Sequence, residues 1–164
     1  MEKEEAGKKS SLKKELSLII PTYNEAENIP ELLERIEASL KNLDAEIILV
    51  DDNSPDGTAN LTETLGKKYG NVKVLRRPYK KGLASAVLDG LKLTEADVVA
   101  VMDADLQHPP ELLPKMYEKL KQGYVLAVAS RYVKGGKIEG WSLGRKLLSK
   151  CTTKLTHLLL PNTK

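Results

Sequence analysis

Two aspartates, Asp103 and Asp105, are the residues whose type and spacing most favour metal chemistry. They follow the apolar run 98–102, and Gln107 comes two positions after the second aspartate. Carboxylate and amide oxygens suit Mg²⁺ and Mn²⁺, which often share their coordination shell with substrate phosphates. The alternative is a loop with two solvated aspartates. The position at the end of a strand favours a site that neutralises a diphosphate.

The segment 51–57, with the sequence Asp-Asp-Asn-Ser-Pro-Asp-Gly, follows a second apolar run. Its polar residues have the spacing of an EF-hand calcium loop. Such a loop is entered from a helix, however, whereas the preceding residues are typical of a strand, and Pro55 would restrict a loop that wraps an ion. We expect Asp51 to accept hydrogen bonds from a nucleobase. The alternative is a structural turn in which Ser54 or Asp56 caps the next helix.

The segment 21–25, Pro-Thr-Tyr-Asn-Glu, follows a third such run. Here Tyr23 could lie against a base or ribose and Glu25 could bind a sugar hydroxyl, or the segment could be a plain turn. Arg131 could bind a phosphate through its planar guanidinium, although a single arginine at a strand end is often a surface ion-pair partner. Neither a P-loop nor a G-x-G-x-x-G motif is present, which argues against ordinary ATPases and dinucleotide dehydrogenases.

Alternating strands and helices must position these loops. The apolar pattern predicts strands at 16–20, 46–50, 72–75, 98–102 and 125–130. It predicts helices at 29–43, 58–69, 82–93 and 111–120. Short connections between such elements indicate an α/β fold with a mostly parallel sheet covered by helices on both faces. Ligands of such sheets bind outside the carboxyl ends of the strands, where all three loops are expected.

Composition sets further limits. A chain of 164 residues with a net charge of +3 fits one domain and does not suggest a nucleic-acid binder. Cys151 is the single cysteine, so an intramolecular disulfide and a cysteine-rich metal site are excluded, and a reducing, cytosolic setting fits.

Three regions are expected along the chain: a disordered charged tail (1–15), a ligand-binding α/β domain (16–140) and a basic amphipathic helix (141–164). The tail lacks the apolar core of a signal peptide. The helix could lie at a membrane surface or pack on the domain with its lysines solvated. No apolar run approaches the roughly 20 residues that span a bilayer, so membrane contact is expected to be peripheral.

Six motifs, taken in order, resemble those of dolichyl-phosphate mannose synthases, which are inverting family-2 glycosyltransferases. Each motif alone is modest, whereas the ordered set is highly specific. The motifs are Pro21–Glu25, Asp51–Thr58, Gly82-Leu83-Ala84, Asp103–Glu111, Ser130-Arg131-Tyr132 and Gly140-Trp141-Ser142.

The resemblance implies a GT-A fold and transfer of mannose from GDP-mannose to dolichyl phosphate at the cytosolic face of a membrane. It implies nucleotide contacts from a set in the first half of the chain: Pro21, Tyr23, Glu25, Leu49 and Asp51. It implies that a later set holds the sugar diphosphate and a Mn²⁺ or Mg²⁺ ion: Asp103, Ala104, Asp105, Gln107 and Arg131. Within that set, Asp105 and Gln107 would be the metal ligands, and Asp103 and Asp105 the catalytic pair.

The acceptor in this reaction is a phosphate monoester, whose second pKa near 6 leaves it ionised at neutral pH. A general base is therefore dispensable, and we expect catalysis by positioning and by metal stabilisation of the departing GDP.

Members of the family continue past the segment that matches Leu160-Pro161-Asn162 into an acceptor region, so the chain is expected to be truncated. Two alternatives stay open. One is a UDP-sugar-dependent polyprenyl-phosphate glycosyltransferase, and the other is a non-catalytic module that binds a nucleotide sugar.

Overall fold

The computed structural model describes residues 13–79 and 82–130, together with the single residues Val133, Gly144, Ser149 and Thr152. The chain divides into two compact units, residues 1–127 and residues 128–164. Arg131, the tail up to residue 12 and nearly all of the expected helix at 141–164 lie outside the described residues.

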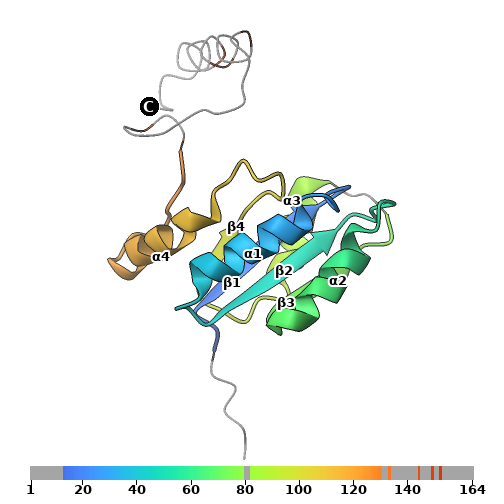
Figure 1. Cartoon of the computed structure of the whole chain (residues 1–164). Coiled ribbons are helices and arrows are strands. Elements are labelled where there is room, and N and C mark those ends of the chain that lie inside the picture. Colours follow the sequence, from blue (N-terminus) through green and yellow to red (C-terminus); the bar gives the residue numbers. More distant parts are fainter. Residues whose placement is uncertain are drawn as a thin grey trace, which may run out of the picture. The chain divides into compact units, whose positions relative to one another are not determined.

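The first unit alternates strands and helices as predicted (Figure 1). The elements are β1 (Leu16–Thr22), α1 (Ile29–Leu40), β2 (Ala45–Asp51), α2 (Thr58–Tyr69), β3 (Val72–Arg76), α3 (Leu83–Leu91), β4 (Val99–Val101), the 3₁₀ turn η1 (Pro110–Leu112) and α4 (Leu113–Lys121). The four strands form one parallel sheet in the order β3-β2-β1-β4. The strand order reverses between β1 and β4, which is where parallel sheets of this type bind ligands.

Helices cover both faces of the sheet, as the apolar strands predict. Alternate residues of β1 point to opposite faces, so Leu18 and Ile20 join the core under α1, whereas Ile19 packs with Ala86 of α3. The packing of α3 is close, because a Cβ atom added to Gly90 would lie 2.7 Å from Cγ2 of Ile19. Glycine at this position lets the helix backbone approach the sheet.

β1 continues through Pro21, where the sequence predicted that it stops. On β1, the backbone groups of Ser17 and Ile19 bond toward β4, to Val98 and Met102. Pro21 is two residues further on and therefore faces the same side. β4 has ended at Val101 by that point, so the N–H group that proline lacks would have no partner in the sheet. The strand keeps its pairing with β2 up to the Thr22–Asp51 pair.

The prediction of a strand at 125–130 is wrong, because these residues have no regular secondary structure. Val125 is 98% exposed, and both Leu126 and Val128 are 74% exposed. An apolar run becomes a strand only where a neighbouring strand supplies hydrogen-bond partners, and within the described residues none pairs with this run.

Glu46 is a buried carboxylate near the amino end of β2. The Ser17 hydroxyl donates a hydrogen bond to it, the Glu95 N–H donates another at 2.7 Å, and the Lys73 ammonium lies 2.9 Å away. Burial raises the pKa of Glu46, but the contacts with Ser17, Lys73 and Glu95 outweigh burial and lower the pKa below its ordinary value of 4.5. The ionised form of Glu46 therefore stabilises the fold.

The pKa of Glu46 gives the fold an acid-sensitive contribution. A carboxylate whose pKa is lower in the folded than in the unfolded chain stabilises the fold at pH values above its unfolded pKa. This stabilisation is lost as the pH falls from about 4.5 through the pKa of the folded state. Glu46→Gln is expected to lower the free energy of unfolding by about 1–3 kcal/mol at pH 7 and to flatten its decline below pH 4.5. Urea denaturation at a series of pH values measures both. Glu118→Gln, on the exposed side of α4, should keep the wild-type profile, and an unchanged acid limb in Glu46→Gln would contradict the assignment.

Candidate functional site

The loops that follow β1, β2 and β4 meet at the carboxyl edge of the sheet, because these strands are parallel neighbours. Each loop contains a non-glycine residue with positive φ: Asn24 at 60°, Asn53 at 58° and Leu106 at 59°. No other described non-glycine residue has this conformation. Asparagine tolerates it, whereas for leucine it is unfavourable. Such backbone conformations tend to occur at functional sites.

The loop after β4 exposes two carboxylates around a buried alanine. Ala104 is 2% exposed and belongs to the core, whereas the side chain of Asp103 is 47% exposed and Asp105 is exposed. The Gln107 N–H donates to Asp105 Oδ1 at 3.0 Å, and the Asp103 N–H donates to His108 Nδ1 at 3.3 Å. These two bonds give the loop its compact shape. The acidic side chains are left accessible to a ligand.

The donor atoms of this loop are of the kind that Mg²⁺ and Mn²⁺ prefer. Asp105 offers a carboxylate and Gln107 an amide oxygen, and both side chains are exposed. Within residues 13–79 and 82–130, no three histidine, cysteine, aspartate or glutamate side chains gather as a metal site. The residues present fit an ion that takes one or two protein ligands and completes its shell with phosphate oxygens and water.

Asp51, expected to bind a nucleobase, is 2% exposed. Its carboxylate accepts hydrogen bonds from the Ser54 N–H at 2.9 Å, the Ser54 hydroxyl at 2.5 Å and the Thr22 hydroxyl at 3.3 Å. These contacts stabilise a turn, but α2 is not capped by Ser54 or Asp56 as the alternative expected, because its N-cap residue is Gly57, which forms no side-chain capping bond. Contact with a base through Asp51 stays a prediction.

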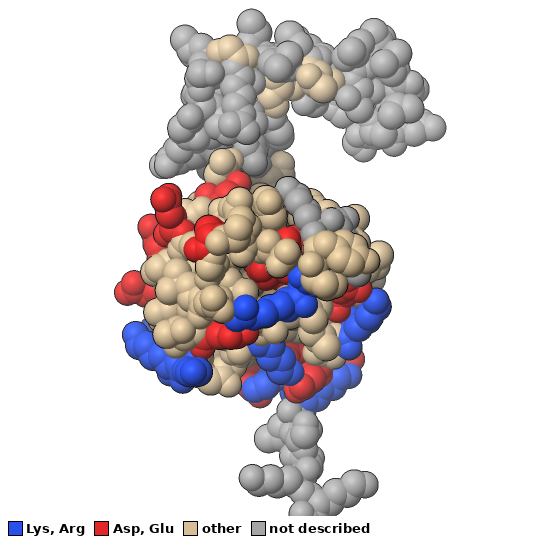
Figure 2. Space-filling model, turned by 90° about the vertical axis from the view of Figure 1, so that its right-hand side faces the viewer, with Lys and Arg blue, Asp and Glu red and all other residues tan. Residues whose placement is uncertain are grey.

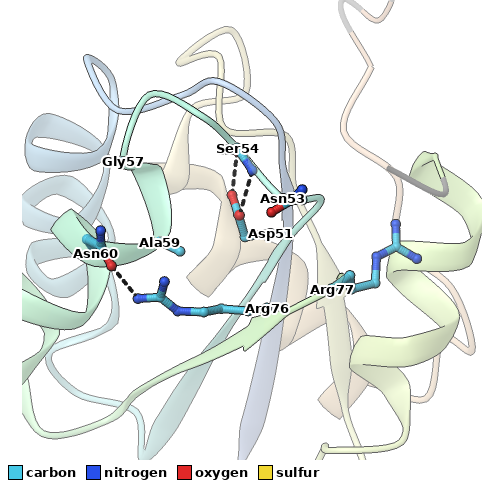
Figure 3. A pocket seen from close by; sticks show the side chains of 8 residues that line it. All are labelled: Asp51, Asn53, Ser54, Gly57, Ala59, Asn60, Arg76 and Arg77. Atoms are coloured by element: carbon cyan, nitrogen blue, oxygen red, sulfur yellow. Dashed lines mark hydrogen bonds between the residues drawn. The ribbon is translucent and has the colours of Figure 1, made fainter. Parts of the chain in front are cut away.

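A small polar pocket lies between the end of β2, the start of α2 and the end of β3 (Figure 3). Its lining residues are Asp51, Asn53, Ser54, Gly57, Ala59, Asn60, Arg76 and Arg77. In Figure 3 the Arg76 side chain reaches toward Asn60, with Nη2 bonded to Asn60 Oδ1 at 2.6 Å, whereas the Arg77 side chain points away. Asn60 and Arg76 were not predicted from the sequence as site residues. Arg76 follows an apolar run, so the strand-end rule could have found it.

Arg77 joins the ends of β2 and β3 to the start of α3. Its side chain is 2% exposed and forms an ion pair with Asp52, whose side chain is 6% exposed. It also donates to Ser85 Oγ at 2.7 Å, to the Gly82 carbonyl at 3.0 Å and to Asp89 at 3.3 Å. The Gly82 N–H in turn donates to Asp52 at 2.9 Å. This network fixes the backbone at the start of α3.

The remaining expected nucleotide contacts lie on β1, the loop after it, and β2. Pro21 is partly buried, and Tyr23 is 39% exposed at the carboxyl edge. One carboxylate oxygen of Glu25 accepts a hydrogen bond from Asn28 Nδ2 at 2.7 Å, at the start of α1. Leu49 is fully buried in the core, so its side chain does not reach the surface. Arg131 lies outside the described residues.

Seen from the side where the strands end, the described surface carries acidic and basic side chains close together (Figure 2). A site for a nucleotide diphosphate and a cation requires this mixture, because the ligand combines negative charge with hydrogen-bond donors and the cation needs carboxylates.

Residues 17–164 match the family model for glycosyl transferase family 2. The chain is a member of this family. The predicted GT-A α/β fold is thereby confirmed, since the parallel sheet with helices on both faces is the arrangement observed. The three strand-end loops are the part of this family 2 domain best placed to bind a ligand.

Two curated relatives confirm the resemblance to dolichyl-phosphate mannose synthases. The chain is 53% identical over 146 residues to the dolichol-phosphate mannosyltransferase of Pyrococcus furiosus, which covers 89% of the chain and 41% of that relative. It is 38% identical over 139 residues to the enzyme of the same name from Saccharomyces cerevisiae, covering 82% and 52%. The family 2 chain thus spans about half the length of these relatives or less.

Two solved structures resemble the fold. A mannosyltransferase from Pyrobaculum calidifontis in complex with GDP-Man and Mn²⁺ has a TM-score of 0.52 and 26% identity, covering 58% of this chain and 28% of that chain. TarS from S. aureus has the same TM-score and identity, covering 66% and 32%. In the part of this family 2 chain that the structure describes, no helix combines the length and hydropathy needed to cross a membrane.

Proposed function

We propose that the chain binds a nucleotide sugar at the carboxyl edge of its sheet and transfers mannose from GDP-mannose to dolichyl or another polyprenyl phosphate. The single observation that carries the proposal is the loop of Asp103, Asp105 and Gln107 at the strand-order reversal, beside the loops that follow β1 and β2. The named relatives support the choice of mannose and of a lipid phosphate.

The two halves of the proposed donor occupy different loops. The nucleobase would enter the pocket between β2, α2 and β3, where Asn53, Asn60 and Arg76 offer polar groups beside Asp51. Tyr23 and Glu25 would contact the ribose side, and Pro21 and the backbone at Leu49 would border the nucleotide. Asp103 and Ala104 would hold the sugar diphosphate. Arg131 would contact the donor phosphates or sugar.

Asp105 and Gln107 would hold a Mn²⁺ or Mg²⁺ ion between the chain and the diphosphate, and the ion would neutralise the charge that develops on the departing GDP. The residue geometry supports this, since both side chains are exposed on one short loop. The solved mannosyltransferase with GDP-Man and Mn²⁺ is a second support for a divalent cation.

The reaction we propose needs no general base. An oxygen of the acceptor phosphate attacks the anomeric carbon of mannose and forms the new C–O bond, while the bond to the diphosphate breaks and GDP leaves with its electron pair. Attack opposite the leaving group inverts the anomeric centre. The acceptor is already ionised, so Asp103 acts by orienting the donor rather than by taking a proton.

Calorimetric titration with GDP-mannose, UDP-glucose and GDP, each with Mn²⁺ or Mg²⁺, tests donor binding. We expect GDP-mannose to bind only with a divalent cation. Tighter binding of UDP-glucose would replace the donor assignment, and no metal-dependent binding of any nucleotide would refute the whole proposal.

Lipid vesicles carrying polyprenyl phosphate test the acceptor and the location. The proposal places the chain peripherally at a cytosolic membrane face, so we expect it to float with such vesicles and to mannosylate the lipid. Donor binding without transfer would instead favour a nucleotide-sugar-binding module.

A further inference from the structure

Three consecutive backbone amides after β1 donate to side chains of the loop after β2 and of Thr58, the first residue of α2. The bonds are Asn24 N–H to Ser54 Oγ, Glu25 N–H to Thr58 Oγ1 and Ala26 N–H to Asp56 Oδ2, each 3.0 Å long. Asn28, at the start of α1, makes no side-chain capping bond. The amides of residues 24–26 are therefore satisfied by side chains of the neighbouring segment 54–58.

Two of the acceptors are hydroxyl groups whose own protons are engaged elsewhere. The Ser54 hydroxyl donates to Asp51 Oδ1 at 2.5 Å, and the Thr58 hydroxyl donates to Asp56 Oδ1 at 2.6 Å. A hydroxyl has one proton, so each is left with lone pairs only and must accept from the facing amide. Buried Asp51 and ionised Asp56 thus set the direction of both chains of hydrogen bonds.

Asp56 is held in its ionised form. Burial raises the pKa of Asp56, but bonds from the Thr58 hydroxyl, the Ala26 N–H and the Thr58 N–H outweigh it and lower the pKa below the ordinary value. The Thr58 N–H bond is 3.0 Å long. A charged acceptor makes stronger hydrogen bonds than a neutral one, so the Asp56 carboxylate holds the loop after β1 firmly to the loop after β2.

We propose that Ser54, Asp56 and Thr58 form a latch that holds the segment 21–25 in the shape required to receive the nucleotide. Asn24 adopts positive φ in this segment, a conformation that needs outside support, and Tyr23 is the neighbouring exposed side chain. The three latch residues are positioning residues, acting through the backbone that carries Tyr23 and Glu25. The nucleotide as ligand rests on the proposed function, whereas the hydrogen bonds of the latch are independent of it.

Removal of one hydroxyl at a time tests the latch. Thr58→Val is the decisive variant, because Thr58 is buried and is not among the residues that line the pocket. Ser54→Ala removes the other hydroxyl, and Thr58→Ser restores the group that valine lacks. Thr64→Val is the matched control, since Thr64 lies on the same helix and its hydroxyl donates to the Asn60 carbonyl on an exposed surface.

Two measurements separate the latch from the ligand. Amide hydrogen exchange of the free protein, resolved by NMR, should accelerate about 5- to 10-fold at Glu25 in Thr58→Val and at Asn24 in Ser54→Ala. The affinity for GDP in the presence of Mn²⁺ should fall about 3- to 10-fold in both variants, while Thr58→Ser and Thr64→Val stay near the wild type.

Each outcome decides a different claim. Unchanged exchange at Asn24 and Glu25 would refute the latch. Faster exchange with unchanged GDP affinity would refute its role in positioning the segment for a nucleotide. If the wild-type chain bound no nucleotide, the proposed function would fail together with the positioning role, while the exchange rates would still decide whether the latch exists.

Discussion

Asp105→Asn is expected to weaken the metal-dependent binding of GDP-mannose by about 100-fold or more. Substituting a residue that only hydrogen-bonds to a metal ligand already lowers metal affinity or activity about 10- to 100-fold, and a ligand itself should matter more. The substitution keeps the size of the side chain and an oxygen that can accept the Gln107 N–H bond. What it removes is the negative charge and a strong oxygen ligand. The loss should therefore fall on metal and diphosphate binding, with the loop shape preserved.

Calorimetry at saturating Mn²⁺ or Mg²⁺ measures this loss. The same titration with GDP in place of GDP-mannose should show a similar loss of affinity, because both ligands contain the diphosphate. Asp97→Asn is the matched control: it removes a carboxylate that is 82% exposed and paired with Lys13, away from the carboxyl edge. An Asp105→Asn variant that bound the donor as tightly as the wild type, or transferred mannose at the full rate, would show that Asp105 is not a metal ligand.

Arg77→Met is expected to lower the free energy of unfolding by about 3–5 kcal/mol, the usual cost of removing one partner of a buried ion pair. Methionine fills much of the space of arginine but leaves the carboxylate of Asp52 buried without the guanidinium of Arg77. The Gly82 carbonyl and Ser85 lose a donor as well. The start of α3 should therefore loosen before the sheet does.

Denaturation in guanidinium chloride measures the effect, with two comparisons. Arg76→Met changes the neighbouring arginine, which is 47% exposed and paired with half-exposed Glu63, so its cost should stay within about 1 kcal/mol. The double variant Asp52→Asn, Arg77→Met also removes the carboxylate charge that Arg77 balances, and should cost less than the sum of its two single variants. Equal losses for Arg76→Met and Arg77→Met would contradict the buried network.

The sequence was sufficient to predict the strands of the sheet and the position of the three loops at one edge of it. Apolar runs between polar segments located β1 to β4, and α2 begins at Thr58 and ends at Tyr69 as predicted. The strand-end rule then grouped Asp51 with Asp103 and Asp105 at one edge. These features depend on local periodicity and on a general rule of parallel sheets, both of which a single sequence contains.

Features that depend on distant partners could not be predicted. The run at 125–130 has strand composition, but whether it pairs depends on a neighbour that no local pattern reveals. Asp52, Arg77 and Asp89 are far apart in the sequence, and only the folded sheet brings them together. The contacts of Asp51 with Thr22 and Ser54 also depend on the fold, and one carboxylate stabilises a turn at the same edge where a ligand is expected.

The central place of β1 also has a kinetic consequence. β1 pairs with β2 after a single intervening helix, whereas its pairing with β4 must close a much longer stretch of chain that includes two more helices. Closing a longer loop costs more entropy, so the β1–β2 unit is expected to form first. Pulse-labelled hydrogen exchange during refolding would show protection of β2 amides ahead of those of β4. The side of the carboxyl edge proposed to bind the base would then exist before the acidic loop arrives beside it.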